Sequence, residues 1–171
     1  MARKAKNEIR MGIKGEARLA CVNPDGTLAW KTPWIHNVIT NNGFQDYLAM
    51  ALAGSAASKL ALYMGLGTTT AAIATNATAL GGEISLGAVV TRQTFVRSVS
   101  ASKTLQMLAT FASGSASFFT QTGTGLPMAN VGLYNTNDSN GVMMCGLTYA
   151  VQNVASNQQV NATYQLSFTT A

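Results

Sequence analysis

The sequence contains few charged side chains. Asp, Glu, Lys and Arg make up 10% of its 171 residues, whereas an average soluble domain has ~25%. A solitary domain usually stays soluble through a dense surface of mixed charges. Here the polar positions are mostly Thr, Ser, Asn and Gln, which lose their hydration readily and suit permanent contacts. The composition therefore favours a subunit of an assembly.

Titratable groups are also scarce, which argues against an enzyme. The chain has one histidine and six acidic residues, and no two acids are spaced for general acid–base catalysis. His36 lies near two tryptophans and is predicted to be packed and hydrogen-bonded. Zinc needs clustered Cys and His, which are absent. Residues 65–68, Gly-Leu-Gly-Thr, lack the lysine and the following helix of a phosphate loop. We predict no catalytic site, metal or cofactor.

Cysteines and long apolar runs are equally limited. Cys21 and Cys145 are far apart and form no CxxC motif, so reduced core thiols are predicted, although a disulfide between them stays open. The apolar stretches are too short and too interrupted to cross a bilayer. The basic start is not followed by the apolar run of a secretory signal. No membrane association is expected.

The basic residues gather near the start of the chain. Of the eleven Lys and Arg residues, six lie within the first eighteen positions, and Asp138 is the only charged residue after position 103. Residues 1–10 are predicted to form a basic arm. Such an arm can dock on an acidic protein surface or bind nucleic acid, and we favour the protein surface because no nucleic-acid-binding motif is present. The candidate partner-binding residues are Arg3, Lys4, Lys6, Arg10 and Lys14.

Period-two alternation predicts β-strands along most of the remaining chain. Residues 11–22 and 160–170 alternate most clearly between apolar and polar side chains. The turn at 23–26, Asn-Pro-Asp-Gly, predicts a hairpin with a partner strand at 27–30. Residues 34–39 follow Pro33 and are predicted to be an edge strand or linker. Further strands are predicted at 60–65, 89–99, 104–112, 115–122, 129–134 and 142–151.

One helix interrupts this pattern. Apolar residues recur at helical spacing over 42–53, a polar residue at 40–42 can cap the helix, and Gly54 ends it. Residues 68–82 are predicted to be a long loop. We therefore predict a mainly β fold with residues 11–171 as one domain. It should be an antiparallel β-sandwich, jelly-roll-like or immunoglobulin-like, of about eight strands with one short α-helix near residues 42–53.

Several segments together resemble a known protein class. After the hairpin come Trp-Ile-His-Asn-Val-Ile-Thr-Asn-Asn-Gly at 34–43 and Met-Gly-Leu-Gly-Thr-Thr-Thr at 64–70. Ala-Leu-Gly-Gly-Glu at 79–83, Arg92 and Ala-Asn-Val-Gly-Leu-Tyr-Asn at 129–135 follow. The pattern resembles small β-sandwich structural proteins of tailed-bacteriophage particles, which occur as head decoration, fibre-base or tail-associated components. The basic arm is not part of the resemblance.

The resemblance implies a virion structural protein with an architectural role. We expect a capsid decoration or minor capsid component that binds other virion proteins and forms a homo-oligomer, with a trimer as the first expectation. A tail- or neck-associated component is the alternative. Two rivals come from other classes: a nucleic-acid-binding module that uses the arm, and a carbohydrate-binding sandwich that uses Trp30, Trp34 and Tyr134, although core positions are favoured for these aromatics.

Overall fold

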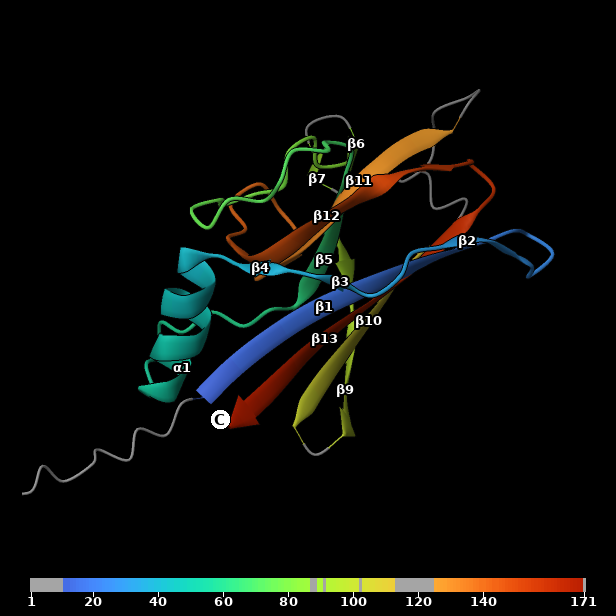
Figure 1. Ribbon diagram of the computed structural model, residues 1–171. Helices are drawn as coiled ribbons and strands as arrows, with labels where there is room; N and C mark the ends of the chain where they lie inside the picture. Colours follow the sequence, from blue (N-terminus) through green and yellow to red (C-terminus); the bar gives the residue numbers. More distant parts are fainter. Residues whose placement is uncertain (1–10, 87–88, 91, 102, 113–124, 171) are drawn as a thin grey trace, which may run out of the picture.

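Two antiparallel sheets form the body of the protein. The computed structural model describes residues 11–86, 89–90, 92–101, 103–112 and 125–170 (Figure 1). The predicted arm at 1–10 and the predicted strand at 115–122 lie outside the described residues. Within these ranges the prediction of a mainly β, antiparallel sandwich with one short helix is confirmed.

The first sheet is built around the two ends of the described chain. Its central pair, β1 (Met11–Val22) and β13 (Gln159–Thr170), is in register over its whole length, with Met11 opposite Thr170. On one side lie β10 (Thr104–Phe111) and β9 (Val96–Ala101), and on the other β2 (Leu28–Lys31) and β3 (Ile35–His36).

The second sheet packs against the first. Its strand order is β4 (Val38–Ile39), β12 (Met143–Val154), β11 (Leu126–Tyr134), β5 (Tyr63–Gly67) and β8 (Gln93–Thr94). A small hairpin of β6 (Ser85–Leu86) and β7 (Val89–Val90) stands apart from both sheets. In the described part of the chain, the two sheets together hold eleven strands rather than about eight.

The extra strands arise because two predicted strands cross between sheets. At the predicted strand 34–39, β3 pairs with β1 in the first sheet and β4 pairs with β12 in the second, with Asn37 between them. The predicted strand 89–99 is divided into β7, β8 and β9, and Phe95 carries the chain from the second sheet to the first. The prediction of one continuous strand at 89–99 was therefore wrong, whereas 34–39, predicted to be an edge strand or linker, forms two short edge strands.

Alternating side chains from both sheets form the core. Leu19, Cys21, Met107, Phe111 and Tyr164 from the first sheet are buried, as the period-two pattern predicted. They meet buried residues of β5, β11 and β12 from the second sheet: Met64, Leu66, Val131, Leu133, Cys145 and Leu147.

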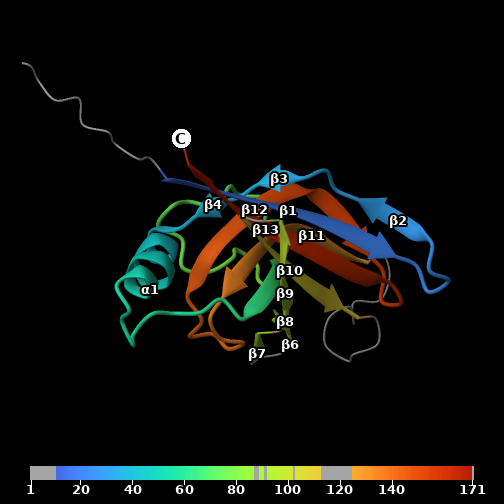
Figure 2. The same ribbon diagram turned by 90° about the horizontal axis from the view of Figure 1, so that it is seen from below.

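The helical segment lies at the end of the sandwich where β1 begins and β13 ends (Figures 1 and 2). It comprises a π-helical turn, η1 (Gly43–Ala49), followed by α1 (Met50–Leu52). Thr40 caps it, because its hydroxyl oxygen accepts the Gly43 amide at 3.0 Å. Gly54 ends it with φ +66°. Of the apolar residues at helical spacing over 42–53, only Tyr47 is buried, whereas Leu52 is 82% exposed.

Candidate interaction surfaces

Of the five predicted partner-binding residues, the structure describes only Lys14. Arg3, Lys4, Lys6 and Arg10 lie outside the described residues. Lys14 lies on the outward face of β1, and its ammonium group is 3.3 Å from the Glu16 carboxylate. Glu16 also lies 3.9 Å from His36 Nδ1. Lys14 is thus exposed but partly neutralised, and the arm remains a prediction.

His36 differs from the sequence-based interpretation, and the three aromatic residues differ from one another: Tyr134 has the core position that was favoured, Trp30 is partly buried against the core, and Trp34 is 36% exposed. The side chain of His36 is 70% exposed rather than packed. Tyr134 is fully buried, and its phenolic oxygen accepts the Leu80 amide at 2.8 Å. The Arg18 guanidinium lies over the Trp34 ring, 4.6 Å from the ring centroid. A sugar-binding platform that includes Tyr134 is therefore excluded, since a buried ring cannot stack on a surface ligand.

Both cysteines are free and buried, which confirms the prediction of reduced core thiols. Burial raises the pKa of Cys21 and of Cys145 to about 11. In the described ranges, no group of three or more His, Cys, Asp or Glu residues could hold a metal ion. No helix in those ranges is long and apolar enough to span a membrane.

A buried arginine organises the loops above the second sheet. Arg92 Nε lies 2.6 Å from Glu83 Oε1, and Nη2 lies 2.9 Å from Oε2, so the pair is bidentate. Nη1 donates to the carbonyl oxygens of Thr136 and Asp138, and the guanidinium lies 3.4 Å from the Tyr134 ring centroid. These contacts engage the guanidinium on every side. Arg92 therefore holds these loops together, and its guanidinium is not available to bind a ligand.

Asn130, on β11, fixes the two ends of the loop at 68–82. Its side-chain amide donates to the carbonyl oxygens of Thr69 and Gly81, at 2.8 and 3.0 Å. Glu83 forms an isolated bridge with Gly67, next to these contacts. The predicted loop at 68–82 is thus confirmed as a segment without strands, and both its ends are pinned to the second sheet.

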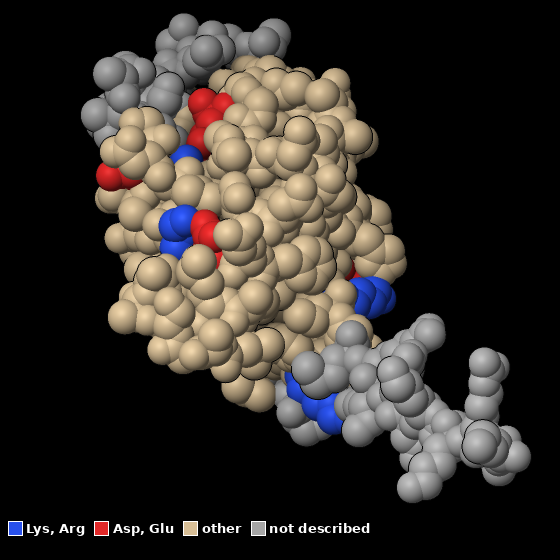
Figure 3. Space-filling model, turned by 90° about the vertical axis from the view of Figure 1, so that its left-hand side faces the viewer, with Lys and Arg blue, Asp and Glu red and all other residues tan. Residues whose placement is uncertain are grey.

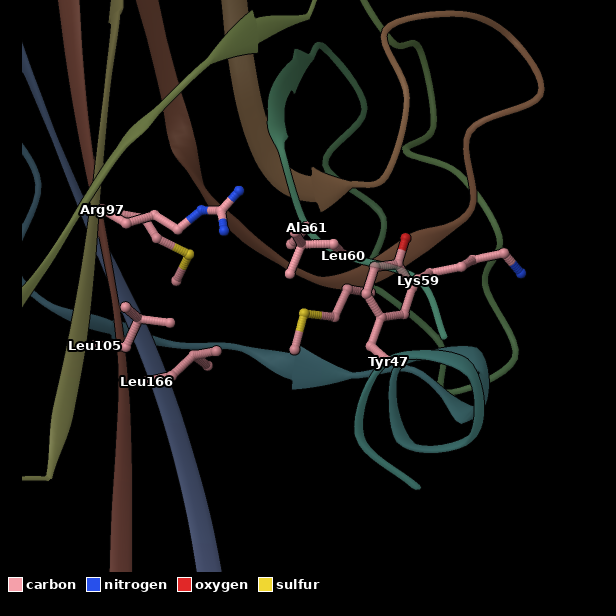
Figure 4. A pocket seen from close by; sticks show the side chains of 9 residues that line it. Tyr47, Lys59, Leu60, Ala61, Arg97, Leu105 and Leu166 are labelled. Carbon is pink, nitrogen blue, oxygen red and sulfur yellow. The ribbon is translucent and has the colours of Figure 1, made fainter. Parts of the chain in front are cut away.

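The end of the sandwich beneath the helix is open and apolar. A cavity of about 110 Å³ lies between the first sheet and the helical segment, and its lining is mostly apolar (Figure 4). Arg97 extends into this space from β9, whereas the amine of Lys59 points away from it and pairs with Asp46. The lining residues are Tyr47, Lys59, Leu60, Ala61, Arg97, Leu105, Met107, Met144 and Leu166.

A second hollow continues this apolar end. Its volume is about 350 Å³, and it shares Tyr47 with the first. Apolar side chains from β1, β13 and the helix line it: Ile13, Leu48, Ala51, Leu52 and Phe168. A volume of this size falls within the roughly 300–1,000 Å³ of ordinary binding clefts, so the surface can accept apolar groups of a neighbour.

The outer edge of the first sheet is also apolar. Val96 and Val99 on β9 are 73% and 75% exposed, and Leu108, directly opposite Val96 on β10, is 45% exposed. Charged groups are sparse elsewhere: on the face in Figure 3, the described Lys, Arg, Asp and Glu residues form small isolated spots in a neutral surface. Val96 and Leu108 are cross-strand neighbours on one face, and neighbouring exposed apolar residues are typical of interaction sites.

The geometry thus presents three features suited to protein contacts: an open apolar end, an apolar sheet edge and neutral strand faces. Comparisons of the chain with protein families, with curated proteins and with solved structures found no match.

Proposed function

We propose that this chain is a structural protein of a tailed-bacteriophage virion, a capsid decoration or minor capsid component that joins neighbouring subunits. The observation that carries the proposal is the open apolar end beneath the helix, next to the exposed edge of β9. Few charges surround these surfaces, so their burial against a neighbour requires little ion desolvation.

The described charged groups support an architectural role. The buried pair Arg92–Glu83 holds loops in place, and the pair Lys59–Asp46 fastens the segment after the helix to the helix itself. The backbone amide of Lys59 also donates to the Asp46 carbonyl oxygen at 2.8 Å. These ions therefore stabilise the fold, and the surface available to partners is mostly neutral.

The basic arm is proposed as the tether to the particle. The buried hydrophobic residues of the described fold all lie between Ala17 and Leu166, and β1 pairs with β13 from Met11 onward. A variant that lacks residues 1–10 should therefore fold, and we expect it to lose attachment. An electrostatic tether should also weaken as salt screens exposed charges.

The test uses particles of the phage that encodes this chain, assembled without it. The purified full chain and the variant lacking residues 1–10 are added, and occupancy is measured by sedimentation at low and high salt. Light scattering on the purified chain gives its oligomeric state. We expect saturable occupancy by the full chain alone. A monomer that does not bind the particles would contradict the proposal.

A rival role for the same arm is nucleic-acid binding. Filter binding of the full chain to DNA at two salt concentrations distinguishes it, because phosphate contacts give a steep dependence of affinity on salt. Strong DNA binding that is lost with residues 1–10, together with no particle binding, would favour the rival.

A further inference from the structure

Within the described ranges, the edge strand β9 has little structural protection against pairing with another strand: its one irregularity, a register shift with β10 between Val99 and Ala101, lies at the end of the strand and leaves 96–99 regular. It is the longest of the described edge strands, with six residues, and pairs only with β10. Free edges usually carry lysine, proline, a bulge or a covering segment, because their open backbone groups recruit other strands. The described part of β9 contains no lysine or proline, and Val96 and Val99 are among the most exposed apolar residues.

The opposite edge of the same sheet is different. There β2 and β3 are four and two residues long, and Lys31 and Pro33 lie where a longer strand would otherwise continue. The edge strands of the second sheet, β4 and β8, have two residues each. Short, interrupted edges discourage pairing, so β9 is the edge at which a partner strand is best accommodated.

The inner face of β9 carries a cation without a carboxylate partner. Arg97 lies opposite the buried Met107 and extends into the open cavity (Figure 4). Within the described ranges no Asp or Glu forms an ion pair with it, and its one recorded ring contact is Phe95, 5.6 Å away. A carboxylate from outside the described fold would therefore complement Arg97.

A second copy of β9 cannot supply that carboxylate. Pairing two β9 strands antiparallel with matched faces places Arg97 opposite a residue of the same face, which before the register shift means Arg97, Val99 or the preceding Phe95. None of these is acidic, and a pairing of Arg97 with itself would set like charges against each other. Self-association through this edge is therefore disfavoured.

We propose that β9 accepts an antiparallel strand from a different protein, which carries Asp or Glu opposite Arg97 and apolar residues opposite Val96 and Val99. Main-chain hydrogen bonds provide the affinity in such strand addition, and alternate side chains provide the specificity. The cavity of about 110 Å³ behind Arg97 leaves room for small inward side chains, since it is several times the roughly 10–15 Å³ that one water molecule needs. That the partner is a virion subunit rests on the proposed function.

The test uses the full chain and a capped peptide, Thr-Val-Thr-Glu-Val-Thr, whose glutamate falls opposite Arg97 in the antiparallel register. A matched peptide has lysine in place of glutamate. Binding is measured by titration, following the backbone amide resonances of residues 96–101. We expect the glutamate peptide to shift these resonances and to bind roughly tenfold more tightly than the lysine peptide, given the usual size of cross-strand charge effects.

Three variants give the test its controls. Arg97→Glu should reverse the preference, so that the lysine peptide becomes the tighter ligand. Val99→Lys should abolish binding by both peptides, because it installs the usual protection of a free edge. Leu28→Lys makes the same kind of change at a 58% exposed site on the other side of the sheet and should leave binding unaltered.

Equal affinity for both peptides, no shift at residues 96–101, or a dimer that Val99→Lys dissociates would each overturn the inference. The peptide test needs no particle. Peptide binding with failed particle attachment would refute the proposed function alone, whereas attachment without peptide binding would refute this inference alone.

Discussion

Removing the guanidinium of Arg92 should destabilise the protein more than any other single loss of charge in the described fold. The side chain of Arg92 is 1% exposed and that of Glu83 is 10% exposed. In an Arg92→Met variant, Glu83 would remain as a buried charge without its bidentate partner. The carbonyl oxygens of Thr136 and Asp138 would also lose their donor.

Breaking a buried ion pair by removing one partner costs about 3–5 kcal/mol. For a chain of this size, each kcal/mol lowers the midpoint temperature by roughly 2–4 °C, so the expected fall is roughly 6–20 °C. The assay is urea unfolding followed by tryptophan fluorescence, which gives the free energy of unfolding directly. Arg97→Met is the matched control, because Arg97 is exposed, and it should change that free energy by less than about 0.5 kcal/mol.

A double variant distinguishes the free energy lost with the contacts of Arg92 from the cost of leaving the Glu83 carboxylate buried without a partner. Arg92→Met combined with Glu83→Gln removes both charges, and its cost should fall below the sum of the two single costs by more than about 1 kcal/mol. The reasoning is refuted if Arg92→Met costs no more than Arg97→Met, or if the two single costs add without interaction.

Three further predictions concern the helix cap and the thiols. Thr40→Val should lower the free energy of unfolding by about 1–2 kcal/mol in urea titrations, since the hydroxyl both caps Gly43 and donates to the Met144 carbonyl oxygen. Gly43→Ala should destabilise in the same assay, although alanine ordinarily favours a helix by about 1 kcal/mol, because the added carbon would overlap the Met144 carbonyl oxygen. Cys21 and Cys145, whose folded pKa of about 11 exceeds the ordinary 9.0, bind more protons in the folded state, so stability should be full below pH 9 and decline towards pH 11. Denaturation over this pH range checks the decline, and replacing both cysteines with alanine should lessen it.

The strands that the sequence predicted well are those in which local alternation and tertiary burial agree. In β13, every second side chain from Val160 to Leu166 faces the core, and no other constraint competes with that pattern. The strand divisions at Asn37 and Phe95 carry no comparable local signal. Each depends on which sheet offers a pairing partner: β4 pairs with β12, more than one hundred positions away, and β8 pairs with β5, about thirty positions away.

The surroundings of Arg92, Arg97 and His36 could not be predicted from the sequence for a similar reason. Arg92 and Glu83 are nine residues apart in a non-helical segment, so their pairing depends on how the intervening chain folds. Nothing in the alternation of residues 89–99 distinguishes the enclosed Arg92 from Arg97, which faces an open cavity. His36 was expected to pack beside its aromatic neighbours, but the crossing between sheets turns it outward beside Glu16.

The complete pairing of β1 with β13 has a mechanical consequence. Met11 and Thr170 are directly opposite each other, so a force that pulls these two residues apart would open the ladder one residue pair at a time. A load applied along β1 by an anchored N-terminal segment, with the rest of the body held, would instead be shared by all the hydrogen bonds of that ladder at once. The same strand pair would separate at low force when its ends are pulled apart and at high force when one strand is pulled along the other. The direction of the load would therefore decide the force that the protein withstands.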